Sequence, residues 1–477
     1  MIDFAGADLE TLIRVDGADC GCGREHAAAL RFLRIGPGVI QAAPEALGAL
    51  GKTKPFVVCD ENTYEVAGKR VTGILDSAGI SHSLFVFPGR KGKIEPDERA
   101  VGALTMAYDS SCDSVIAVGS GVINDCCKVL AHAAGVPSIA VGTAPSMDGY
   151  ASNSSSMIRD RIKVSLYNEC PAAIICDTEV MRRAPMEMLL AGLGDMLAKY
   201  VAICEWRISH IVTGEYYCEN VAGLMRRSLR RCVESAEGLV RREAEAVGAV
   251  AEGLVLSGVA MSFAKISRPA SGLEHYFSHM WEMMALERGE DSALHGVQCG
   301  VGTALTLRLI DRLRTKTPDK AYACAVIKAF DEEAWEARMR GIFGRTADSV
   351  ISAVNGEGFQ NDPVRHEKRI SCIVERWPEI LSIIDEELPD AGELIGLMRK
   401  LGMSATPSDL GVSAADTRGA YIGSRVIRDK YLTSSLIWDL GYESEFAELA
   451  AALALGDGDR PLCRCGDAAH PRLREGD

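Results

Sequence analysis

Short apolar runs rich in β-branched residues alternate with helical stretches through the first third of the chain. Near-continuous apolar runs are typical of parallel strands that are covered on both faces of a sheet. Between these runs, residues 63–78 and 97–108 have helical spacing, and Pro96 and Asp97 stand where a helix start is expected. The pattern predicts a doubly wound α/β domain. Its predicted strands are Phe56–Asp60, Ser83–Phe87, Ser114–Ser120 and Pro137–Thr143.

The pattern changes after Asp177, and from Met186 onward nearly every segment has helical spacing. A chain of 477 residues is long enough for two domains, each with its own core. We therefore place a domain boundary near Arg183–Pro185. The predicted organisation is an N-terminal extension (1–30), an α/β domain (31–184), an all-α domain (185–455) and a polar tail (456–477).

The composition is that of a soluble globular protein, with 47% hydrophobic and 25% charged residues. A net charge of −14 without a basic patch argues against a nucleic-acid surface, although local groups can still bind small phosphorylated molecules. The apolar run AEGLVLSGVAMSFAKI is interrupted by Glu252 and Lys265, so we expect no membrane span. The N-terminus lacks the features of a signal peptide, and the 16 cysteines are scattered through apolar segments. We therefore expect reduced thiols and a cytoplasmic protein.

Two clusters of cysteine and histidine stand near the ends of the chain. Cys20, Cys22 and His26 belong to the motif CGCGREH, and CRCGDAAH (463–470) again offers two cysteines and one histidine. Each cluster is one ligand short of the four that a structural zinc site uses. The C-x-C spacing is also tighter than the usual C-x2-C, so a zinc site within one cluster, a site shared by both, and a chance grouping all stay open. We expect neither cluster to be the catalytic centre.

Three of the nine histidines, His275, His279 and His295, fall within residues 267–303. His275 and His279 are four residues apart and would share one face of a helix. Imidazoles from two consecutive elements are able to converge on one divalent metal, with a carboxylate completing the set. Asp195 stands in an apolar helical stretch and needs a partner if it is buried, which a shared metal would supply. The alternative is that core or surface histidines are clustered by chance.

The strand that ends in Gly119 passes through Ser120 and Gly121 into a helical stretch. Glycines at such a turn let the backbone approach a pyrophosphate, and the N–H groups of the helix N-terminus bind it. Asn124 replaces the third glycine of the G-x-G-x-x-G fingerprint, so the motif alone is a weak signal. Asp60 ends another strand and is placed either to bind a ribose or to cap a helix.

The polar loop TAPSMDGYASNSSSM (143–157) follows the last predicted strand and contains Asp148. Ligands bind at the C-terminal ends of strands in such sheets, so we expect this loop to line a binding site rather than to act as a linker. Lys163 lies just beyond the loop. It is either an anion-binding residue or an exposed lysine on an edge strand.

Several blocks of the sequence resemble the sn-glycerol-1-phosphate dehydrogenases: VGSGVINDCCKVLAHAAGVPSIAVGTAPSMDGYAS, AGLGDMLAKYVAICEW, GEYYCENVA and SRPASGLEHYFSHMWE…LHG. This family belongs to the superfamily of glycerol dehydrogenase, iron-containing alcohol dehydrogenases and dehydroquinate synthase. The blocks occur in the family's order, and the resemblance covers residues 31–441. It implies a Rossmann-like N-terminal domain, an all-α C-terminal domain, an active site in the cleft between them, and a homodimer.

Matching the blocks residue by residue implies that Asp195, His275 and His295 bind one divalent metal, with zinc as first choice and nickel or iron as alternatives. His279 would line the substrate pocket or support the ligands, and Asp148 would lie near the nicotinamide and the substrate. The residues implied to bind NAD or NADP are Asp60, Gly119, Ser120, Gly121, Asp125, Thr143, Ser146 and Ser152.

The implied reaction is the reversible reduction of dihydroxyacetone phosphate to sn-glycerol 1-phosphate, a lipid precursor, by NADH or NADPH. The metal would act as a Lewis acid on the C2 carbonyl, while the cofactor donates the hydride. Either a metal-bound water or a relay of Asp148 and His279 would deliver the proton. Arg268 is the first choice for binding the substrate phosphate, followed by Lys163 and Lys199.

Two departures from the family pattern are Gln298-Cys299 and the segment RDKYLTSS (428–435), which matches the family's basic-aromatic helix only loosely. Within the superfamily, dehydroquinate synthase is disfavoured because its first metal ligand is a glutamate. Glycerol dehydrogenase or another polyol or sugar-phosphate oxidoreductase fits the metal set. A non-catalytic NAD or sugar-phosphate binding protein is the rival from a different class, and the intact ligand set argues against it. A neutral residue in place of Arg268 would separate a phosphate-specific enzyme from the others.

Overall fold

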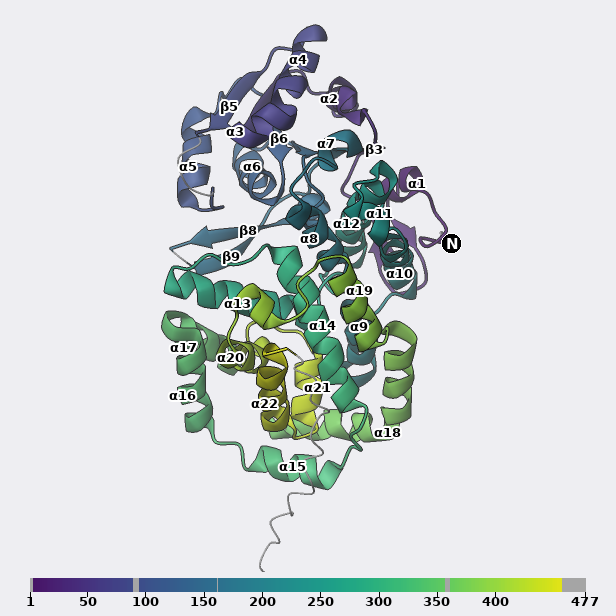
Figure 1. Ribbon diagram of the computed structural model, residues 1–477, viewed down its shortest axis with the longest axis vertical. Coiled ribbons are helices and arrows are strands. Elements are labelled where there is room, and N and C mark those ends of the chain that lie inside the picture. Colours follow the sequence, from purple (N-terminus) through teal and green to yellow (C-terminus); the bar gives the residue numbers. More distant parts are fainter. Residues whose placement is uncertain (1–2, 89–93, 161, 357–360, 457–477) are drawn as a thin grey trace, which may run out of the picture.

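A six-stranded parallel sheet forms the centre of the N-terminal region in the computed structural model shown in Figure 1. The structure describes residues 3–88, 94–160, 162–356 and 361–456. The four predicted strands are confirmed, each to within one residue at either end, and the sequence pattern does not single out β3. In spatial order the strands are β3 (Phe32–Gly36), β10 (Ala173–Asp177), β7 (Ser138–Gly142), β6 (Ser114–Gly119), β4 (Pro55–Asp60) and β5 (Ser83–Phe87).

Helices cover both faces of this sheet, as the apolar strands predict. They are α2 (Ala43–Ala49), α3 (Glu61–Thr63), α4 (Lys69–Ser77), α5 (Glu98–Ala107), α6 (Gly121–Ala134) and α7 (Thr178–Met181), with short turns η1 (Val39–Ala42) and η2 (Tyr64–Gly68). Along β4, Val57 and Cys59 lie in a core shared with α2 and α4, whereas Phe56 and Val58 lie in a core shared with α5 and α6. Successive side chains of a strand point to opposite faces, so a strand between two cores is apolar throughout.

The strand order reverses between β4 and β6. From β4 the chain continues outward to β5, whereas from β6 it continues in the other direction to β7 and then β10. In open α/β sheets, ligands bind outside the C-terminal ends of the strands at such a reversal. Asp60 ends β4 and Gly119 ends β6. Two of the predicted cofactor-binding positions therefore flank this point.

A separate antiparallel hairpin, formed by β8 (Ser154–Arg159) and β9 (Ile162–Tyr167), leaves the sheet after β7. Figure 1 shows this hairpin between the α/β region and the helical region, where β9 contacts α13 (Leu273–Arg288). Lys163 of β9 is therefore not an exposed lysine on the edge of the main sheet. Its ammonium forms an ion pair with the carboxylate of Glu282 in α13.

The described part of the chain from Met186 to Ala454 contains helices and no strand. The fold class is confirmed. Helix α7 ends at Met181 and the next helix begins at Met186, on either side of Arg183–Pro185. The limits of the four predicted parts stay a prediction. The helices are α8 (Met186–Leu197), α9 (Lys199–Thr213), α10 (Glu219–Glu234), α11 (Ala236–Val240), α12 (Ala244–Ala264), α13 (Leu273–Arg288), α14 (His295–Leu313), α15 (Lys320–Lys328), α16 (Glu332–Phe343), α17 (Ala347–Gly356), α18 (Pro363–Glu387), α19 (Ala391–Lys400), α20 (Ala414–Ser424), α21 (Thr433–Asp439) and α22 (Glu443–Ala454).

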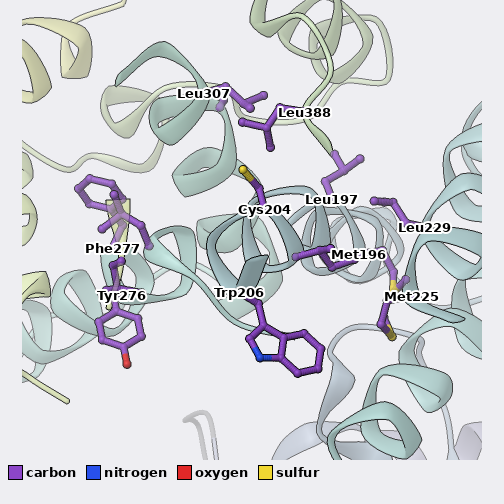
Figure 2. Packing of buried hydrophobic residues seen from close by; sticks show 14 of the residues in the cluster. Met196, Leu197, Cys204, Trp206, Met225, Leu229, Tyr276, Phe277, Leu307 and Leu388 are labelled. Carbon is purple, nitrogen blue, oxygen red and sulfur yellow. The ribbon is translucent and has the colours of Figure 1, made fainter. Parts of the chain in front are cut away.

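One large apolar core holds the helical region together (Figure 2). Trp206 of α9, Met225 of α10, Phe277 of α13 and Leu307 of α14 all belong to it and are almost fully buried. Burying one large apolar side chain stabilises a protein by about 1.5–3 kcal/mol. Side-chain packing therefore fixes how these helices lie against one another, because isolated helices of such length are marginal in water.

The apolar run around Glu252 forms helix α12, and the carboxylate of Glu252 pairs with Arg231 of α10. By length and composition alone α12 would be able to cross a membrane, but 78% of its apolar window is buried inside the protein. A helix that is apolar on all sides and buried in this way is a core helix.

The backbones of α8 and α14 approach each other closely where both helices carry glycine. A Cβ atom on Gly296 would lie 2.0 Å from the carbonyl oxygen of Ala191, and a Cβ atom on Gly194 would lie 2.3 Å from the carbonyl oxygen of Gly296. Real Cβ atoms never approach a backbone oxygen so closely. Glycine is therefore required at this crossing.

We predict that Gly296→Ala destabilises the protein by about 3 kcal/mol or more, because the two backbones must separate. The free energy of unfolding in urea measures the effect. Gly396→Ala is the matched control, since Gly396 lies on the exposed side of α19 with nothing within 4 Å of an added Cβ. It should gain about 0.5–1 kcal/mol from the better helix former. A Gly296→Ala variant as stable as the wild type would contradict the close approach.

Candidate functional site

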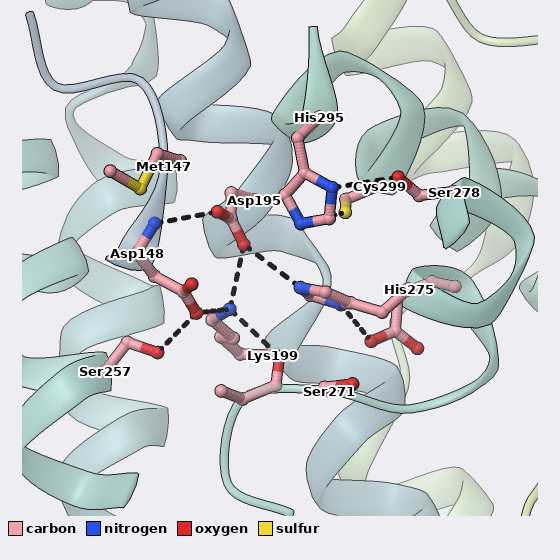
Figure 3. A network of polar contacts seen from close by, with 12 residues as sticks. Met147, Asp148, Asp195, Lys199, Ser257, Ser271, His275, Ser278, His295 and Cys299 are labelled. Atoms are coloured by element: carbon pink, nitrogen blue, oxygen red, sulfur yellow. Dashed lines mark hydrogen bonds and ion pairs between the residues drawn. The ribbon is translucent and has the colours of Figure 1, made fainter. Parts of the chain in front are cut away.

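Four elements bring the predicted active-site residues together, as Figure 3 shows. Asp195 lies on α8, His275 on α13, and His295 is the first residue of α14, while Asp148 begins the short helix η3 (Asp148–Ala151). Asp148 and Asp195 are already linked through the backbone, because the N–H of Asp148 donates to Oδ2 of Asp195 at 2.9 Å. The loop after β7 and helix α8 of the C-terminal region are thus joined at this site.

Oxygen and nitrogen donors converge around His275. Its Nε2 lies 3.5 Å from Oδ1 of Asp195, and its ring centroid lies 5.3 Å from that of His295. Potential ligand atoms lie within 4.8 Å of one another in the group His279–Glu282–His295 and in two groups around His275, Asp148–Asp195–His275 and His275–His295–Cys299. His275 belongs to both of the latter groups, so it joins the carboxylate side of the site to the imidazole side.

Neighbouring side chains orient both imidazoles. Nδ1 of His275 lies 2.9 Å from Oε1 of Glu274, and Nδ1 of His295 lies 2.9 Å from Oγ of Ser278. With Nδ1–H donating in each case, Nε2 keeps its lone pair and faces the other donors. Two oriented imidazoles and a buried carboxylate are a donor set that suits a divalent transition metal. Cys299 belongs to the pair Gln298-Cys299 that departs from the family pattern. Its thiol lies 3.5 Å from Nε2 of His295, beside the two imidazoles.

Lys199 links the two carboxylates of the site. Its ammonium is fully buried and donates to Oδ2 of Asp148 at 2.7 Å, to Oδ1 of Asp195 at 3.0 Å and to the carbonyl of Ala270 at 3.0 Å. Burial lowers the pKa of Lys199, but Asp148 and Asp195 outweigh it and raise this pKa above its ordinary value. Burial raises the pKa of Asp195, but Lys199 and then His275 hold it well below its usual range. Asp195 is therefore ionised at any physiological pH.

His279 lies beside this donor set, with its ring stacked on that of His295 at a centroid separation of 5.7 Å. Its Nδ1 is buried and has no hydrogen-bond partner among the described residues. Burial, followed by repulsion from Lys163 and Arg428, lowers the pKa of His279 well below its ordinary value, so the ring is neutral. Asp148 bonds instead to Lys199 and to Ser257 Oγ, the latter at 2.8 Å. The two members of the predicted proton relay are thus not in direct hydrogen-bond contact with each other in the part of the chain that the structure describes.

A second pair of buried carboxylates lies behind His275. A Cβ atom on Gly272 would lie 2.7 Å from Oε2 of Glu205 and 2.8 Å from Oε2 of Glu274, so these two oxygens face the same small space. Burial, followed by repulsion from Glu274, raises the pKa of Glu205 to about 7. Glu205 is therefore mostly protonated below neutral pH, which leaves Glu274 to accept the hydrogen bond from His275.

The β6–α6 turn has the features that a phosphate-binding turn needs. A Cβ atom on Gly119 would lie 2.6 Å from Cβ of Ile123, so the turn accommodates only glycine. No side chain caps the N-terminus of α6 at Ser120, which leaves its first N–H groups available to an anion. Thr143 and Ser146 are buried in the loop that follows β7, and the N–H of Thr143 donates to the carbonyl of Gly119 at 3.0 Å.

Asp60 has the alternative role that the sequence leaves open. Its Oδ1 accepts the N–H of Thr63 at 2.7 Å, and together the two residues form a capping box at the start of α3. The residue still ends β4 at the reversal of strand order and is only half-buried. Contact with a ribose stays a prediction.

Lys128 of α6 is an organising residue that sequence reasoning missed. It is buried, its Nζ donates to the carbonyls of Gly149 and Ser154 at 3.2 and 2.5 Å, and it pairs with Asp125 at 2.9 Å. It therefore fixes the loop of Asp148 against α6, and a lysine inside the apolar helix INDCCKVLAH was the available signal. Asp125 and Ser152 belong to the same network, Ser152 through a hydrogen bond from the N–H of Ser154 at 3.0 Å. Their contact with the cofactor stays a prediction.

Comparisons with known proteins identify the family of the chain. A glycerol-1-phosphate dehydrogenase [NAD(P)+] of Halalkalibacterium halodurans is 34% identical over 290 residues, which are 60% of this chain and 73% of that protein. The chain belongs to the glycerol-1-phosphate dehydrogenase family. A relative of the same name from Bacillus licheniformis is 27% identical over 436 residues, 91% of this chain and 95% of its own, and one from Methanosarcina acetivorans is 35% identical over 280 residues, 58% and 76%.

Two further comparisons place this family member more broadly. Residues 34–185 match the family model described as iron-containing alcohol dehydrogenase. Among solved structures, glycerol dehydrogenase from Schizosaccharomyces pombe superposes with a TM-score of 0.56 at 15% identity, over 89% of this chain and 91% of that one. A probable glycerol dehydrogenase from Sinorhizobium meliloti gives 0.55 at 15%, over 89% and 98%. These structural likenesses show that the glycerol-1-phosphate dehydrogenase family member shares their fold.

The structure does not support Arg268 as the residue that binds a substrate phosphate. Its side chain is 1% exposed, and its Nε and Nη2 donate to the carboxylate of Glu215 at 2.9 and 2.6 Å. Its Nη1 donates to the carbonyl of Tyr431 at 2.9 Å. The guanidinium of Arg268 therefore has a structural role. It links the loop before α13 to Glu215, between α9 and α10, and to Tyr431, just before α21. Lys199 is likewise occupied by two carboxylates.

Two cations from the loosely matching segment RDKYLTSS lie near the site and were missed. Nη2 of Arg428 donates to Oγ of Ser165 in β9 at 3.1 Å, and the side chain is exposed. Nζ of Lys430 donates to the carbonyl of Ser271 at 3.1 Å, and burial, followed by repulsion from Arg268, lowers its pKa to about 7. Ser165 and Lys163 are two residues apart on β9 and share one face of the hairpin, so Arg428 lies on the side that carries Lys163. The two basic residues of RDKY were the sequence signal.

We predict that Glu205 makes folding stability fall as pH rises. Its pKa is raised from 4.5 to about 7 on folding, so the folded protein binds a proton that the unfolded chain has already released between these values. Glu205→Gln removes this loss, and the variant should gain about 3 kcal/mol relative to the wild type as pH rises from 4.5 through 7, with the gain levelling off above that pH. Urea unfolding at a series of pH values measures the difference. Glu367→Gln, at an exposed glutamate, is the control, and a pH-independent difference for Glu205→Gln would refute the assignment.

Proposed function

We propose that the protein catalyses the reversible reduction of dihydroxyacetone phosphate to sn-glycerol 1-phosphate with NADH or NADPH. The observation that carries the proposal is the convergence of Asp195, His275 and His295 in a member of the glycerol-1-phosphate dehydrogenase family. The acidic net charge of the protein does not oppose binding of a phosphorylated ketone. Cations near the site, rather than the charge of the whole protein, would bind the phosphate.

Asp195, His275 and His295 would hold the divalent ion, of which zinc is the first choice and nickel or iron(II) the alternatives. When bound, the ion supplies Lewis-acid stabilisation of the negative charge that develops on the carbonyl oxygen of the substrate. Glu274 supports the site by accepting the Nδ1–H of His275, and Ser278 supports it through His295. The identity of the ion is a question for experiment.

The dinucleotide would lie across the reversal of strand order, with its pyrophosphate on the uncapped N-terminus of α6. Gly119 and Gly121 keep side chains away from that position, and Thr143 and Ser146 line it from the next loop. The half-buried Asp60 is placed at the ribose end and favours a free 2′-hydroxyl, which we propose as a preference for NAD over NADP.

Lys199 keeps Asp195 ionised and holds the carboxylates of Asp148 and Asp195 in place next to His275. This arrangement holds the carboxylate ligand in place before an ion arrives, and such preorganisation lowers the cost of binding in a buried site. The neutral His279, whose Nδ1 has no hydrogen-bond partner among the described residues and lies 3.8 Å from Oε2 of Glu282, would exchange a proton with the hydroxyl oxygen of the product.

The phosphate of the substrate would bind to the exposed Arg428 of the segment before α21, and to Lys163 of the β8–β9 hairpin if the phosphate displaces Glu282 from its ammonium. Charge-assisted hydrogen bonds to a phosphate are stronger than neutral ones, and arginine offers a planar pair of donors. This pair replaces Arg268 in that role. A glycerol dehydrogenase without phosphate specificity is the second candidate, and the exposed Arg428 beside the site argues against it.

We further propose that the protein works in the cytoplasm and as a homodimer. The 14 cysteines that the structure describes are all free, which agrees with a reducing compartment. The dimer rests on the family, and light scattering after gel filtration would test it.

We predict that protein stripped of metal by a chelator oxidises neither NADH nor NADPH with dihydroxyacetone phosphate, and that zinc, nickel or iron(II) restores turnover. His295→Ala should lower the restored rate at least about a hundredfold, because a ligand of the ion is lost. The absorbance of the reduced nicotinamide gives the rate, and the enantiomer of the product is identified with a stereospecific assay. Turnover that survives without any metal, or with His295→Ala, would contradict the proposed site.

We predict that Arg428→Gln raises KM for dihydroxyacetone phosphate about tenfold or more, since one charge-assisted hydrogen bond is lost. Reduction of unphosphorylated dihydroxyacetone should be unchanged by this substitution. Arg418→Gln is the matched control, because Arg418 is exposed on α20 and pairs with Glu448. If KM for the phosphorylated substrate stays the same in Arg428→Gln, the phosphate is bound elsewhere.

A further inference from the structure

The N-terminal motif CGCGREH meets a fourth potential ligand from a distant part of the chain. Cys20 and Cys22 lie in the turn between β1 (Ala18–Asp19) and β2 (Glu25–His26), and His26 is the last residue of β2. Cys218 is the N-cap residue of α10, some 200 positions further along the sequence. Sequence spacing gave no reason to connect it with the N-terminal motif. The four ligand atoms, three Sγ and Nε2 of His26, all lie within 4.8 Å of one another.

The distances between these atoms are near those of a tetrahedral zinc site, and two of the nitrogen–sulfur distances are somewhat shorter. Sγ of Cys20 lies 3.5 Å from Sγ of Cys218, and Nε2 of His26 lies 3.0, 3.3 and 3.9 Å from the sulfurs of Cys20, Cys22 and Cys218. Zinc bonds of about 2.3 Å to sulfur and 2.0 Å to nitrogen place tetrahedral ligands about 3.6–3.8 Å apart. The Cys20–Cys218 separation is far longer than the S–S bond of about 2.05 Å in a disulfide.

The surrounding residues prepare His26 to be a ligand. Its Nδ1 lies 3.0 Å from the carbonyl oxygen of Phe263, and donation of Nδ1–H to this oxygen leaves the lone pair of Nε2 facing the three sulfurs. The imidazole is fully buried, and the ring of Phe4 packs edge-on against it at a centroid distance of 5.1 Å. A buried histidine that is oriented by a backbone carbonyl is typical of metal sites.

The turn that carries the cysteines also has a conformation suited to this role. Gly21 and Gly23 follow the two cysteines and have φ of +83° and +85°, a region that favours glycine. The hydroxyl of Tyr216 lies 3.1 Å from Sγ of Cys22, and it can donate to a thiolate. Cys218 is the N-cap residue of α10, so the start of this helix fixes the position of its sulfur.

We propose that Cys20, Cys22, His26 and Cys218 bind a structural zinc ion, separate from the ion of the cleft. Four protein ligands close the coordination sphere, and three soft sulfurs with one imidazole select zinc over the hard cations. The three thiols release their protons when the ion binds. The C-terminal cluster Cys463, Cys465 and His470 lies outside the described residues, and the site is complete without it.

The ion would fasten the N-terminal segment to the helical region at two places. One is the loop between α9 and α10, through Cys218 and Tyr216, and the other is the end of α12, through the carbonyl of Phe263. Arg24 adds to the second contact by donating to the carbonyl of Ala264 at 2.7 Å. Helix α12 carries Ser257, which bonds to Asp148, and its end leads through residues 265–272 into the helix of His275. The zinc ion therefore supports the position of the catalytic elements without taking part in the chemistry.

The test measures zinc in the full-length protein after dialysis against a chelator, which removes an ion from an open cleft faster than from a closed four-ligand site. We expect about one zinc ion per chain to remain, and zinc X-ray absorption to show sulfur ligands at about 2.3 Å. This readout uses the wild-type protein and so does not depend on the folding of a variant. Zinc with only nitrogen and oxygen ligands, or a protein that keeps no zinc, would overturn the proposal.

Substitutions then assign the site. Cys20→Ser/Cys22→Ser should lose the retained ion, whereas Cys463→Ser/Cys465→Ser should keep it, and Cys324→Ser on α15 should leave it unchanged as a control for a half-buried cysteine elsewhere. Retention of the ion in Cys20→Ser/Cys22→Ser, or its loss in the tail variant, would place the sulfur ligands elsewhere and refute the assignment. A disulfide between Cys20 and Cys218 in freshly purified, unreduced protein, found by mass spectrometry of peptides, would also refute it.

Discussion

The site depends on the close crossing of α8 and α14. At Gly194 and Gly296 the backbones approach within a distance that no side chain would allow, and these glycines stand next to Asp195 and His295. The crossing therefore places a carboxylate of one helix opposite an imidazole of another. Helices that pack through ordinary side chains lie about 8–10 Å apart. A closer crossing, which brings the helices of Asp195 and His295 together, needs residues without Cβ atoms at the contact. His275 then reaches the same space from α13, which packs against α14.

Charge balance is the second condition of this site. Asp148 and Asp195 are held near each other in the protein interior, and Lys199 compensates them through hydrogen bonds of 2.7 and 3.0 Å. Leaving a buried charge without its partner costs about 3–5 kcal/mol, so the three residues stabilise the fold only as a set. A divalent ion next to Asp195 would add to this compensation. The same carboxylate thus serves both the folded structure and the proposed chemistry.

Local patterns predict the strands, the helical region and the cluster of three histidines. Burial on two faces and helical spacing both leave a pattern among residues that are close in sequence. The family resemblance carried Asp195 to the same site, and the structure places it there. What local patterns lacked were partners distant in sequence. Arg268 looked available for a phosphate until Glu215 was found beside it, and the motif of Cys20 and His26 lacked a fourth ligand until folding brought Cys218 to it. Arg428 was passed over because its neighbour Ser165 lies on a hairpin that sequence reasoning did not place.

The central claim is that a divalent ion binds between α8, α13 and α14. Anomalous diffraction from crystals of the metal-loaded protein, recorded at the absorption edge of the ion, locates it directly. The account predicts a peak about 2.0–2.2 Å from a carboxylate oxygen of Asp195 and from Nε2 of both His275 and His295. The absence of such a peak, or an ion at this position that Asp195 does not bind, would contradict it.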